Sequence, residues 1–351
     1  MSIINLWVLP LLLLLGVGSA RKEQADSPLG SLVAANRTEL PLRFKYDTLY
    51  NTVTPIISVK VNGVASDLIF DTGSSGLRIL KGALKGANVK LDAKRLTYGY
   101  GSAISTTYIK GQEARGTISV GGLSSDGLLT MMLIDTITHS SSNLVTPTMD
   151  SVALKKVFNG LSGVFGVGMR HGPRSDIASP LAQLPGNHSY LIYFPRYGQL
   201  AGKLVVNPTA SDLTGFTFFS LAPGPNLMPN GLNSWIDNRL NGILVVDGHL
   251  IQATAILDTG NPITQAFVPN LASYGKLAKG TVVTLGIGLP GQTTPLVDTT
   301  FQVTRQIAGR DRIVTNASTP EKDSLAFGTN FFFMFDVYYD QEGGRIGIRK
   351  K

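Results

Sequence analysis

The sequence predicts a mainly β protein built from two related halves, and three observations lead to this prediction. Glycine and proline are frequent, with 39 and 18 among 351 residues, while only 15% of the chain is charged. Such a composition suits short strands and turns better than long surface helices. No helical periodicity extends beyond about three turns. A strand-turn-strand pattern with the same ending occurs twice, and a chain of this length is long enough for two or three compact units.

The first 20 residues differ from the rest. Residues 6–17 form an apolar run of 12, followed by the small residues Gly18, Ser19 and Ala20 that are typical before a signal-peptidase cut. The whole apolar stretch, residues 3–17, is shorter than the roughly 20 residues that a spanning helix needs. We therefore expect a signal peptide over residues 1–20, a short pro-segment or linker over 21–40, and a secreted, extracellular or periplasmic protein. A membrane anchor is the alternative.

Composition also excludes several chemistries. The absence of cysteine rules out disulfides, thiol nucleophiles and thiolate zinc sites. The four histidines lack metal-ligand spacing, so we expect neither a metal nor another cofactor. The formal net charge is +8, but the densest basic stretch has no interleaved aromatic residues, which favours a solvated face over a nucleic-acid partner. The histidines are His139, His171, His188 and His249, and the basic stretch contains Lys81, Lys85, Lys90, Lys94 and Arg95.

The duplicated pattern is the most informative feature. Each copy is an apolar strand, a two-residue turn, a second apolar strand and the triplet Asp-Thr-Gly. Asn-Gly and Asp-Gly are the preferred residues of tight β-hairpin turns. A chain of this composition is expected to contain well under one such triplet by chance, so duplication explains the pair. The copies comprise residues 57–61, Asn62-Gly63, 64–70 and Asp71-Thr72-Gly73, and residues 243–246, Asp247-Gly248, 249–257 and Asp258-Thr259-Gly260.

A second landmark recurs after each triplet. Val164-Phe165-Gly166 follows the first and Ala326-Phe327-Gly328 follows the second. A Pro-Thr-Ala-Ser loop at residues 208–211 lies between the two halves. We therefore expect an N-terminal β lobe over residues 41–208 and a C-terminal β lobe over 209–351. Short helices are expected at residues 150–159 and 268–276, and residues 331–333, all phenylalanine, are expected in the core.

The two triplets are candidates for a catalytic site because each Asp ends a buried strand. A buried carboxylate is costly unless it is hydrogen-bonded or shares a proton. If only one such Asp were present, its role as a structural cap would be a sufficient explanation. Two at matched positions of duplicated halves meet at the pseudo-twofold interface, where both cannot be ionised at once. Such a pair can take a proton from a water molecule and give another to a carbonyl group. Glycine lets the chain turn beside each carboxylate, and threonine can bond to the opposite loop.

On these residues the chain resembles the pepsin-like aspartic proteases over residues 40–348. The first family loop is matched by Asp71-Thr72-Gly73-Ser74-Ser75-Gly76, which also resembles secreted bacterial relatives. The second is matched by Asp258-Thr259-Gly260, and the substrate-covering flap by residues 96–102. Residues 162–168 and 325–347 resemble later family strands.

The resemblance implies a bilobal fold of two pseudo-twofold-related, six-stranded β-barrel lobes with the active cleft between them. It implies a secreted endopeptidase, acting as a monomer on an extended polypeptide. Asp71 and Asp258 would be catalytic. The supporting loop residues would be Thr72, Gly73, Ser74, Thr259, Gly260 and Asn261, and the flap would present Tyr98, Gly99, Tyr100, Gly101 and Ser102.

The chain departs from the family in ways that leave a second function open. Asn261 stands where the family has Ser or Thr, and the tryptophan that orients the flap tyrosine is missing after the first loop. The segment before residue 40 is short for an inhibitory propeptide. The alternative is a pepsin-fold protein that binds peptides, proteins or glycans without cleaving them. For Tyr98, the alternative is a strand tyrosine packed in the core.

Overall fold

The computed structural model describes most of the chain after residue 35. Residues 35–351 form one compact unit. The expected signal peptide and most of the expected linker lie outside the described residues, as do the expected helix at 268–276 and most of that at 150–159. The described ranges are 36–47, 52–101, 105–141, 144–148, 157–172, 177–186, 188–196, 198–267, 277–303, 313–316 and 324–351.

The fold is mainly β, as predicted: 58% of the residues are in strands and 6% in helices. The strands of the first half are β1 (Thr38–Asp47), β2 (Thr52–Val61), β3 (Val64–Asp71), β4 (Ser75–Leu80), β5 (Lys90–Gly101), β6 (Ser105–Gly116), β7 (Ile118–Val120), β8 (Leu123–Ser124), β9 (Leu129–Ser141), β10 (Leu144–Thr148), β11 (Gly163–Val167), β12 (Ser189–Tyr193) and β13 (Ala201–Val206). Short 3-10 helices are η1 (Lys81–Leu84) and η2 (Leu181–Gln183).

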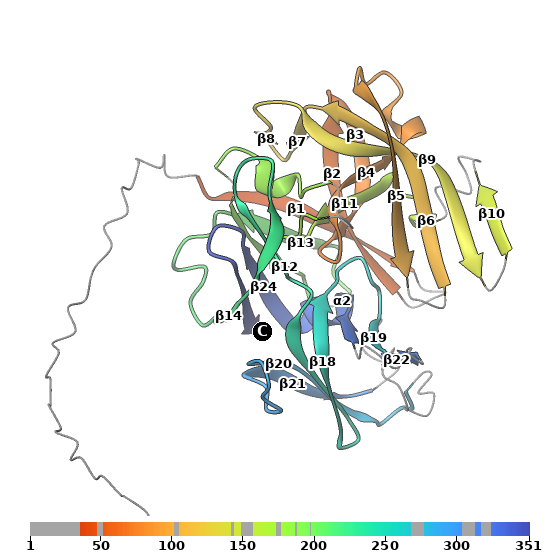
Figure 1. Ribbon diagram of the computed structural model, residues 1–351. Coiled ribbons are helices and arrows are strands. Elements are labelled where there is room, and N and C mark those ends of the chain that lie inside the picture. Colours follow the sequence, from red (N-terminus) through yellow and green to blue (C-terminus); the bar gives the residue numbers. More distant parts are fainter. Residues whose placement is uncertain are drawn as a thin grey trace, which may run out of the picture. The chain divides into compact units, whose positions relative to one another are not determined.

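The strands of the second half are β14 (Thr217–Ser220), β15 (Pro223–Leu227), β16 (Asn233–Trp235), β17 (Leu240–Val246), β18 (His249–Leu257), β19 (Thr264–Phe267), β20 (Val282–Gly288), β21 (Val297–Gln302), β22 (Ile313–Asn316), β23 (Ser324–Phe327), β24 (Phe335–Asp340) and β25 (Arg345–Lys350). A short helix, α2 (Thr329–Met334), precedes β24. Figure 1 shows β12 and β24, which come from different halves of the chain, side by side.

The described strands join into sheets of 16, 7 and 2 strands. The main path of the largest sheet runs β14-β25-β24-β12-β13-β1-β2-β3-β11-β4-β9-β6-β5, so it includes strands from both halves. The seven-stranded sheet has the order β21-β20-β17-β18-β23-β19-β22. The expected lobe boundary at 208/209 stays a prediction, since the largest sheet continues across it.

The predicted repeat has the same topology in both copies. Strands β2 and β3 form a hairpin, β11 pairs with β3 in parallel, and β4 pairs with β11 in antiparallel orientation. In the second copy β17 and β18 form the hairpin, β23 is parallel to β18, and β19 is antiparallel to β23. The turn residues Asn62-Gly63 and Asp247-Gly248 have positive φ angles between 44° and 85°, as the tight hairpin turn requires.

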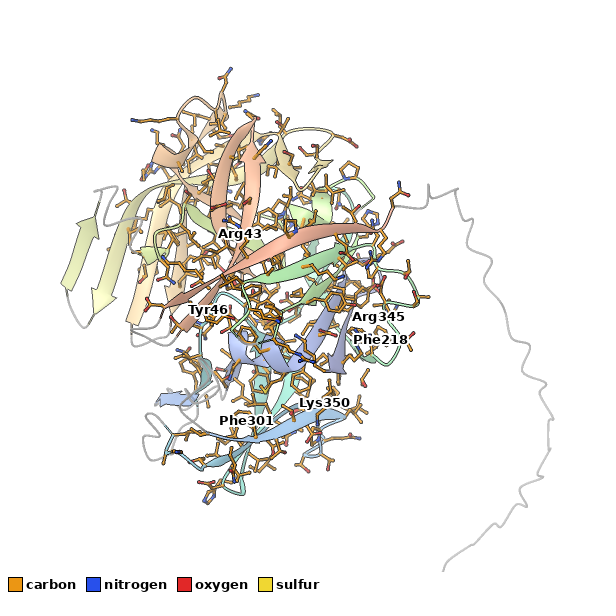
Figure 2. The ribbon with its side chains drawn as sticks, turned by 180° about the vertical axis from the view of Figure 1, so that it is seen from behind. Arg43, Tyr46, Phe218, Phe301, Arg345 and Lys350 are labelled. Carbon is orange, nitrogen blue, oxygen red and sulfur yellow. The ribbon has the colours of Figure 1, made fainter. Side chains whose placement is uncertain are left out.

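The core explains why a chain without disulfides can fold. One large apolar cluster includes side chains from both halves, among them Phe70, Phe165 and Phe327. The phenylalanines of residues 331–333 are buried, as predicted. They lie in α2 and not in a strand. At the surface of the C-terminal strands, the Arg345 guanidinium stacks at 4.8 Å on the Phe218 ring (Figure 2). Each Å² of apolar surface buried in this way contributes about 25 cal/mol to folding, and no covalent cross-link adds to it.

Candidate active site

The two predicted aspartates meet. Asp71 is the last residue of β3, and Asp258 directly follows β18. Each glycine of one triplet packs against the carboxyl group of the other: a Cβ on Gly73 would collide with the Asp258 carboxyl, and one on Gly260 would lie 2.7 Å from Asp71 Cγ. Glycine is therefore needed at both positions because any side chain would occupy the space of the opposite carboxyl group.

Reciprocal hydrogen bonds between Thr72 and Thr259 join the loops. Thr72 Oγ1 donates to the Leu257 carbonyl at 2.7 Å, and Thr259 Oγ1 donates to the Phe70 carbonyl at 2.7 Å. Each hydroxyl also accepts the backbone N–H of the other threonine at 3.0 Å. Both side chains are buried. These four bonds hold the ends of β3 and β18 at a fixed separation, which fixes the positions of the two carboxyl groups.

The two carboxyl groups have different donors. Ser74 Oγ donates to Asp71 Oδ2 at 2.5 Å, and the Gly73 N–H donates to Asp71 Oδ1 at 2.7 Å. Asp258 Oδ1 accepts the backbone N–H of Asn261 at 3.1 Å. The Asn261 side chain is used elsewhere, since its Oδ1 accepts the Ile263 N–H. Asp258 therefore has no hydroxyl donor at the position equivalent to Ser74.

The surroundings of Asp258 favour its protonated form. Burial raises the pKa of Asp258 well above its ordinary value, and the neighbouring Asp71 charge and their mutual hydrogen bond raise it further. Backbone donation from Gly260 and the charge of Arg170 oppose that shift in pKa. Close carboxyl groups share one proton because two adjacent negative charges repel. These surroundings favour a pair with one protonated and one ionised carboxyl group.

The predicted flap residues lie on the hairpin of β5 and β6. Tyr98, Gly99, Tyr100 and Gly101 belong to β5, whereas Ser102 lies outside the described residues. The Tyr98 and Tyr100 rings contact each other with centroids 4.9 Å apart. Burial raises the pKa of Tyr98, and its charge environment includes both Asp71 and Asp258. The hairpin therefore brings Tyr98 close to the pair, while Tyr100 lines the adjacent cleft.

Arg78 is a site residue that the sequence analysis missed. Its side chain is 1% exposed, and its guanidinium carbon lies 3.6 Å from the centroid of the Tyr98 ring. Nη1 donates to the Gly76 carbonyl at 3.4 Å, and within the described part of the chain Nε has no hydrogen-bond partner. The guanidinium is therefore in cation–π contact with the Tyr98 ring. In the sequence, the only signal is a charge inside the apolar run of β4.

A second missed feature is the ion pair of Arg170 with Asp237. Arg170 Nε lies 3.2 Å from Asp237 Oδ1, and Arg170 Nη2 donates to the Gly73 carbonyl at 2.6 Å. Asp237 Oδ2 accepts the Met169 N–H at 2.7 Å. Burial raises the pKa of Asp237, and Arg170 opposes this shift. The pair fixes the segment before β17 to the loop after Asp71.

A cleft of about 740 Å³ opens beside the two aspartates. Most of its lining is apolar or neutral, and its charged side chains are Asp71, Asp258 and Arg239. The lining consists of Ile69, Asp71, Gly73, Tyr100, Thr107, Val157, Phe158, Val164, Asn238, Arg239, Thr254, Ile256, Asp258, Gly260, Asn261, Pro262, Gln265, Phe267, Ser324, Leu325 and Ala326. An apolar cleft with a few convergent polar groups is typical of a ligand site.

Among the described residues, no group of three or more His, Cys, Asp or Glu side chains is placed to hold a metal ion. None of the helices in the same residues has the length and apolar character needed to cross a membrane.

Comparison with known proteins identifies the fold. No family model matches the sequence, and no curated protein matches it. Among solved structures, an aspartic proteinase from Irpex lacteus superposes with a TM-score of 0.55 and 16% sequence identity. The alignment covers 90% of this chain and 98% of the proteinase. At this identity the likeness defines architecture and not activity. The chain has the bilobal β fold of the pepsin-like proteins.

Proposed function

We propose that this protein is a secreted aspartic endopeptidase that hydrolyses peptide bonds with a water molecule activated between Asp71 and Asp258. The observation that carries the proposal is the cross-packed pair of Asp-Thr-Gly loops, in which each glycine makes room for the opposite carboxyl group. Buried carboxyl groups with separated protonation states are the usual means of combining acid and base catalysis near neutral pH. The proposal that the protein is secreted rests on the apolar run and the small residues before position 21.

The proposed chemistry follows from the different donors of the two aspartates. Ionised Asp71, stabilised by Ser74 and Gly73, takes a proton from the water molecule as its oxygen attacks the substrate carbonyl carbon. Protonated Asp258 gives its proton to the carbonyl oxygen, which yields a neutral tetrahedral diol. The proton that Asp71 has gained then passes to the amide nitrogen while ionised Asp258 takes a proton from a hydroxyl of the diol, and the C–N bond breaks. The products are a carboxylic acid and an amine, and one proton again remains on the pair.

The cleft supports an extended polypeptide as substrate. Its apolar walls extend to both sides of the aspartates, since Ile69 and Val164 come from β3 and β11 while Ile256 and Leu325 come from β18 and β23. Side chains alternate across an extended chain, so successive residues of a bound peptide contact opposite walls. The β5–β6 hairpin, through Tyr98, is proposed to cover the bound peptide and exclude water.

One observation favours the alternative of a binding protein without turnover. The Asn261 side chain bonds to the Ile263 N–H and gives no donor to Asp258, so the second carboxyl has weaker support than the first. In that alternative the cleft would hold peptides, but the pair would not activate water.

Peptide-library cleavage at pH 3 to 7 tests the proposal. The purified chain is incubated with the library with and without a statine-type mimic of the tetrahedral diol, and products are identified by mass spectrometry. We expect cleavage that the mimic inhibits. Peptide binding without any product across the whole pH range would support the binding protein instead.

A further inference from the structure

The described cleft lining contains one cationic side chain, Arg239, and the buried ion pair of Arg170 with Asp237 fixes the segment that carries it. Asp237 is 3% exposed and is held by Arg170 and the Met169 N–H. Two residues later, Arg239 lies exposed on the cleft wall, directly before β17. Its backbone position is therefore set on one side by a buried carboxylate and on the other by buried Leu240, the first residue of a paired strand. A side chain mounted on such fixed backbone is suited to specific recognition.

Strand register places Arg239 close to the reacting groups. Leu240 pairs with Ala255 of β18, so one further residue brings Arg239 beside Ile256. Ile256 lines the same cleft and is two residues before Asp258. Neighbouring strands lie about 4.8 Å apart, and an arginine side chain easily extends over that distance. Arg239 is thus within reach of a peptide residue bound next to the aspartates.

The guanidinium is available to a ligand. No side chain in the described ranges forms an ion pair with Arg239, unlike Arg170, Arg95 and Arg345, which each contact a carboxylate. The other charged lining residues are Asp71 and Asp258, which keep one proton between them. A planar guanidinium with several N–H donors binds carboxylates with two parallel hydrogen bonds. The cleft therefore offers a positive group where a substrate side chain passes.

We propose that Arg239 forms a subsite for a carboxylate side chain of the substrate, so that peptides with glutamate or aspartate at one position near the cleaved bond are preferred. This inference rests on the proposed function and names its substrate class. The subsite lies on the wall formed by β17 and β18. The described part of the cleft lining there combines apolar Ile256 with neutral polar side chains such as Thr254 and contains no second cation, so a bound peptide would cover part of the ion pair and strengthen it relative to a pair on an open surface.

Peptide pairs that differ only in Glu against Gln test the subsite, because the two side chains have nearly the same size. Each position on either side of the cleaved bond is varied in turn, and kcat/KM is measured at pH 5.5. We expect the wild type to prefer Glu over Gln by about threefold to tenfold at one position. Arg239→Gln should abolish this ratio. Arg239→Glu should instead favour Lys over Gln at the same position.

Arg196→Gln is the matched control, since Arg196 is exposed, lies outside the cleft lining and has no ion pair within the described residues. It should keep the wild-type ratio. The Glu/Gln ratio should also fall towards 1 below about pH 4, where the substrate glutamate gains a proton while arginine stays charged. The titratable groups that line the cleft, Asp71, Asp258 and Tyr100, act on both peptides of a pair alike.

A binding measurement separates this inference from the proposed function. The same peptide pair, with a statine unit in place of the cleaved bond, is titrated against wild type and Arg239→Gln by calorimetry. Tighter binding of the Glu peptide that depends on Arg239 supports the subsite even if no peptide is cleaved. Equal affinities, or no binding of either peptide, overturn it, as does cleavage of both peptides at equal rates.

Discussion

The Asp71 loop and the Asp258 loop are two copies of the same structural motif, but their surroundings differ. Both follow a hairpin, both lie beside a parallel strand, and their threonines exchange equivalent hydrogen bonds. The residue after each triplet differs: Ser74 donates to its aspartate through a hydroxyl, whereas the Asn261 side chain bonds to backbone instead. Arg170 donates a hydrogen bond to the Gly73 carbonyl of the first loop. Duplication thus builds the symmetric frame, and single residues around it give the two carboxyl groups different hydrogen-bond donors.

Removing either carboxyl group should have the largest effect. Asp71→Asn or Asp258→Asn should lower kcat/KM by at least about 10²- to 10⁴-fold, since each variant removes a proton-transfer group. Turnover of purified variants on a cleaved library peptide measures this loss. Near-wild-type turnover in either variant would contradict the assignment of the pair.

Stability provides the control for these variants. The pKa of Asp258 is raised in the folded protein, so ionisation of this group opposes folding as pH rises from the unfolded value through the folded one. Asp258→Asn lacks this ionisation. Its free energy of unfolding should therefore equal or exceed that of the wild type at pH 7, and the difference should shrink below about pH 4. A less stable variant at pH 7 would show a packing role instead.

Breaking the ion pair of Arg170 should mainly cost stability, and replacing Arg170 also removes its hydrogen bond to the Gly73 carbonyl of the first loop. Arg170→Met leaves the buried Asp237 carboxylate without its cation, which should cost about 3 kcal/mol of unfolding free energy. Urea unfolding measures this. The double variant Arg170→Met/Asp237→Asn should recover a large part of the loss. Arg170→Met should also shift the alkaline limb of kcat/KM to higher pH, because loss of a nearby cation raises the pKa of Asp258, the group that must stay protonated.

Arg78 gives the first loop a contact with the flap that the second loop lacks. The equivalent position after Asp258 is Gln265, which lines the cleft. Tyr98→Ala should lower kcat/KM severalfold without abolishing it, and Arg78→Met should have a similar effect because the ring loses its stacked cation. The double variant should be little worse than either single one. Fully additive losses would show that the two side chains act separately, and a change in stability alone would favour a core role for Tyr98.

The smallest effect is expected at Asn261. A threonine there would supply Asp258 with a hydroxyl donor like Ser74 on the other side. Donors to the ionised form lower a carboxyl pKa. Because Asp258 must stay protonated to act as the acid, the alkaline limb of the kcat/KM profile of Asn261→Thr should lie at lower pH than that of the wild type, whose optimum should be mildly acidic. Coincident alkaline limbs between pH 2 and 8 would show that Asn261 does not influence the pair.

The sequence predicted the parts of the fold that depend on local pattern. The tight turns at Asn62-Gly63 and Asp247-Gly248 are visible because few residues adopt positive φ, and the apolar-apolar-Gly segments mark strands that pair beside each aspartate. Helix α2 was not predicted. All six of its residues are buried, so they show no periodicity that distinguishes a short helix from a strand.

The missed site residues depend on contacts between distant segments. Arg170 and Asp237 are 67 positions apart, and nothing local marks them as partners. Arg78 occupies the buried strand β4, where a sequence pattern predicts an apolar side chain. By contrast, Asp71 and Asp258 were predictable because duplication places equivalent residues at one interface.

Carboxyl-carbon NMR of the two aspartates tests the central claim most directly, namely that Asp71 and Asp258 share one proton held mainly by Asp258. The protein is labelled with ¹³C-aspartate, the two signals are assigned with Asp71→Asn and Asp258→Asn, and pH is varied from 3 to 8. We expect the Asp258 signal to keep the shift of a protonated acid well above pH 4, and to ionise at lower pH when Asp71 is replaced. Independent ionisation of both groups near pH 4, unchanged by either substitution, would contradict the account.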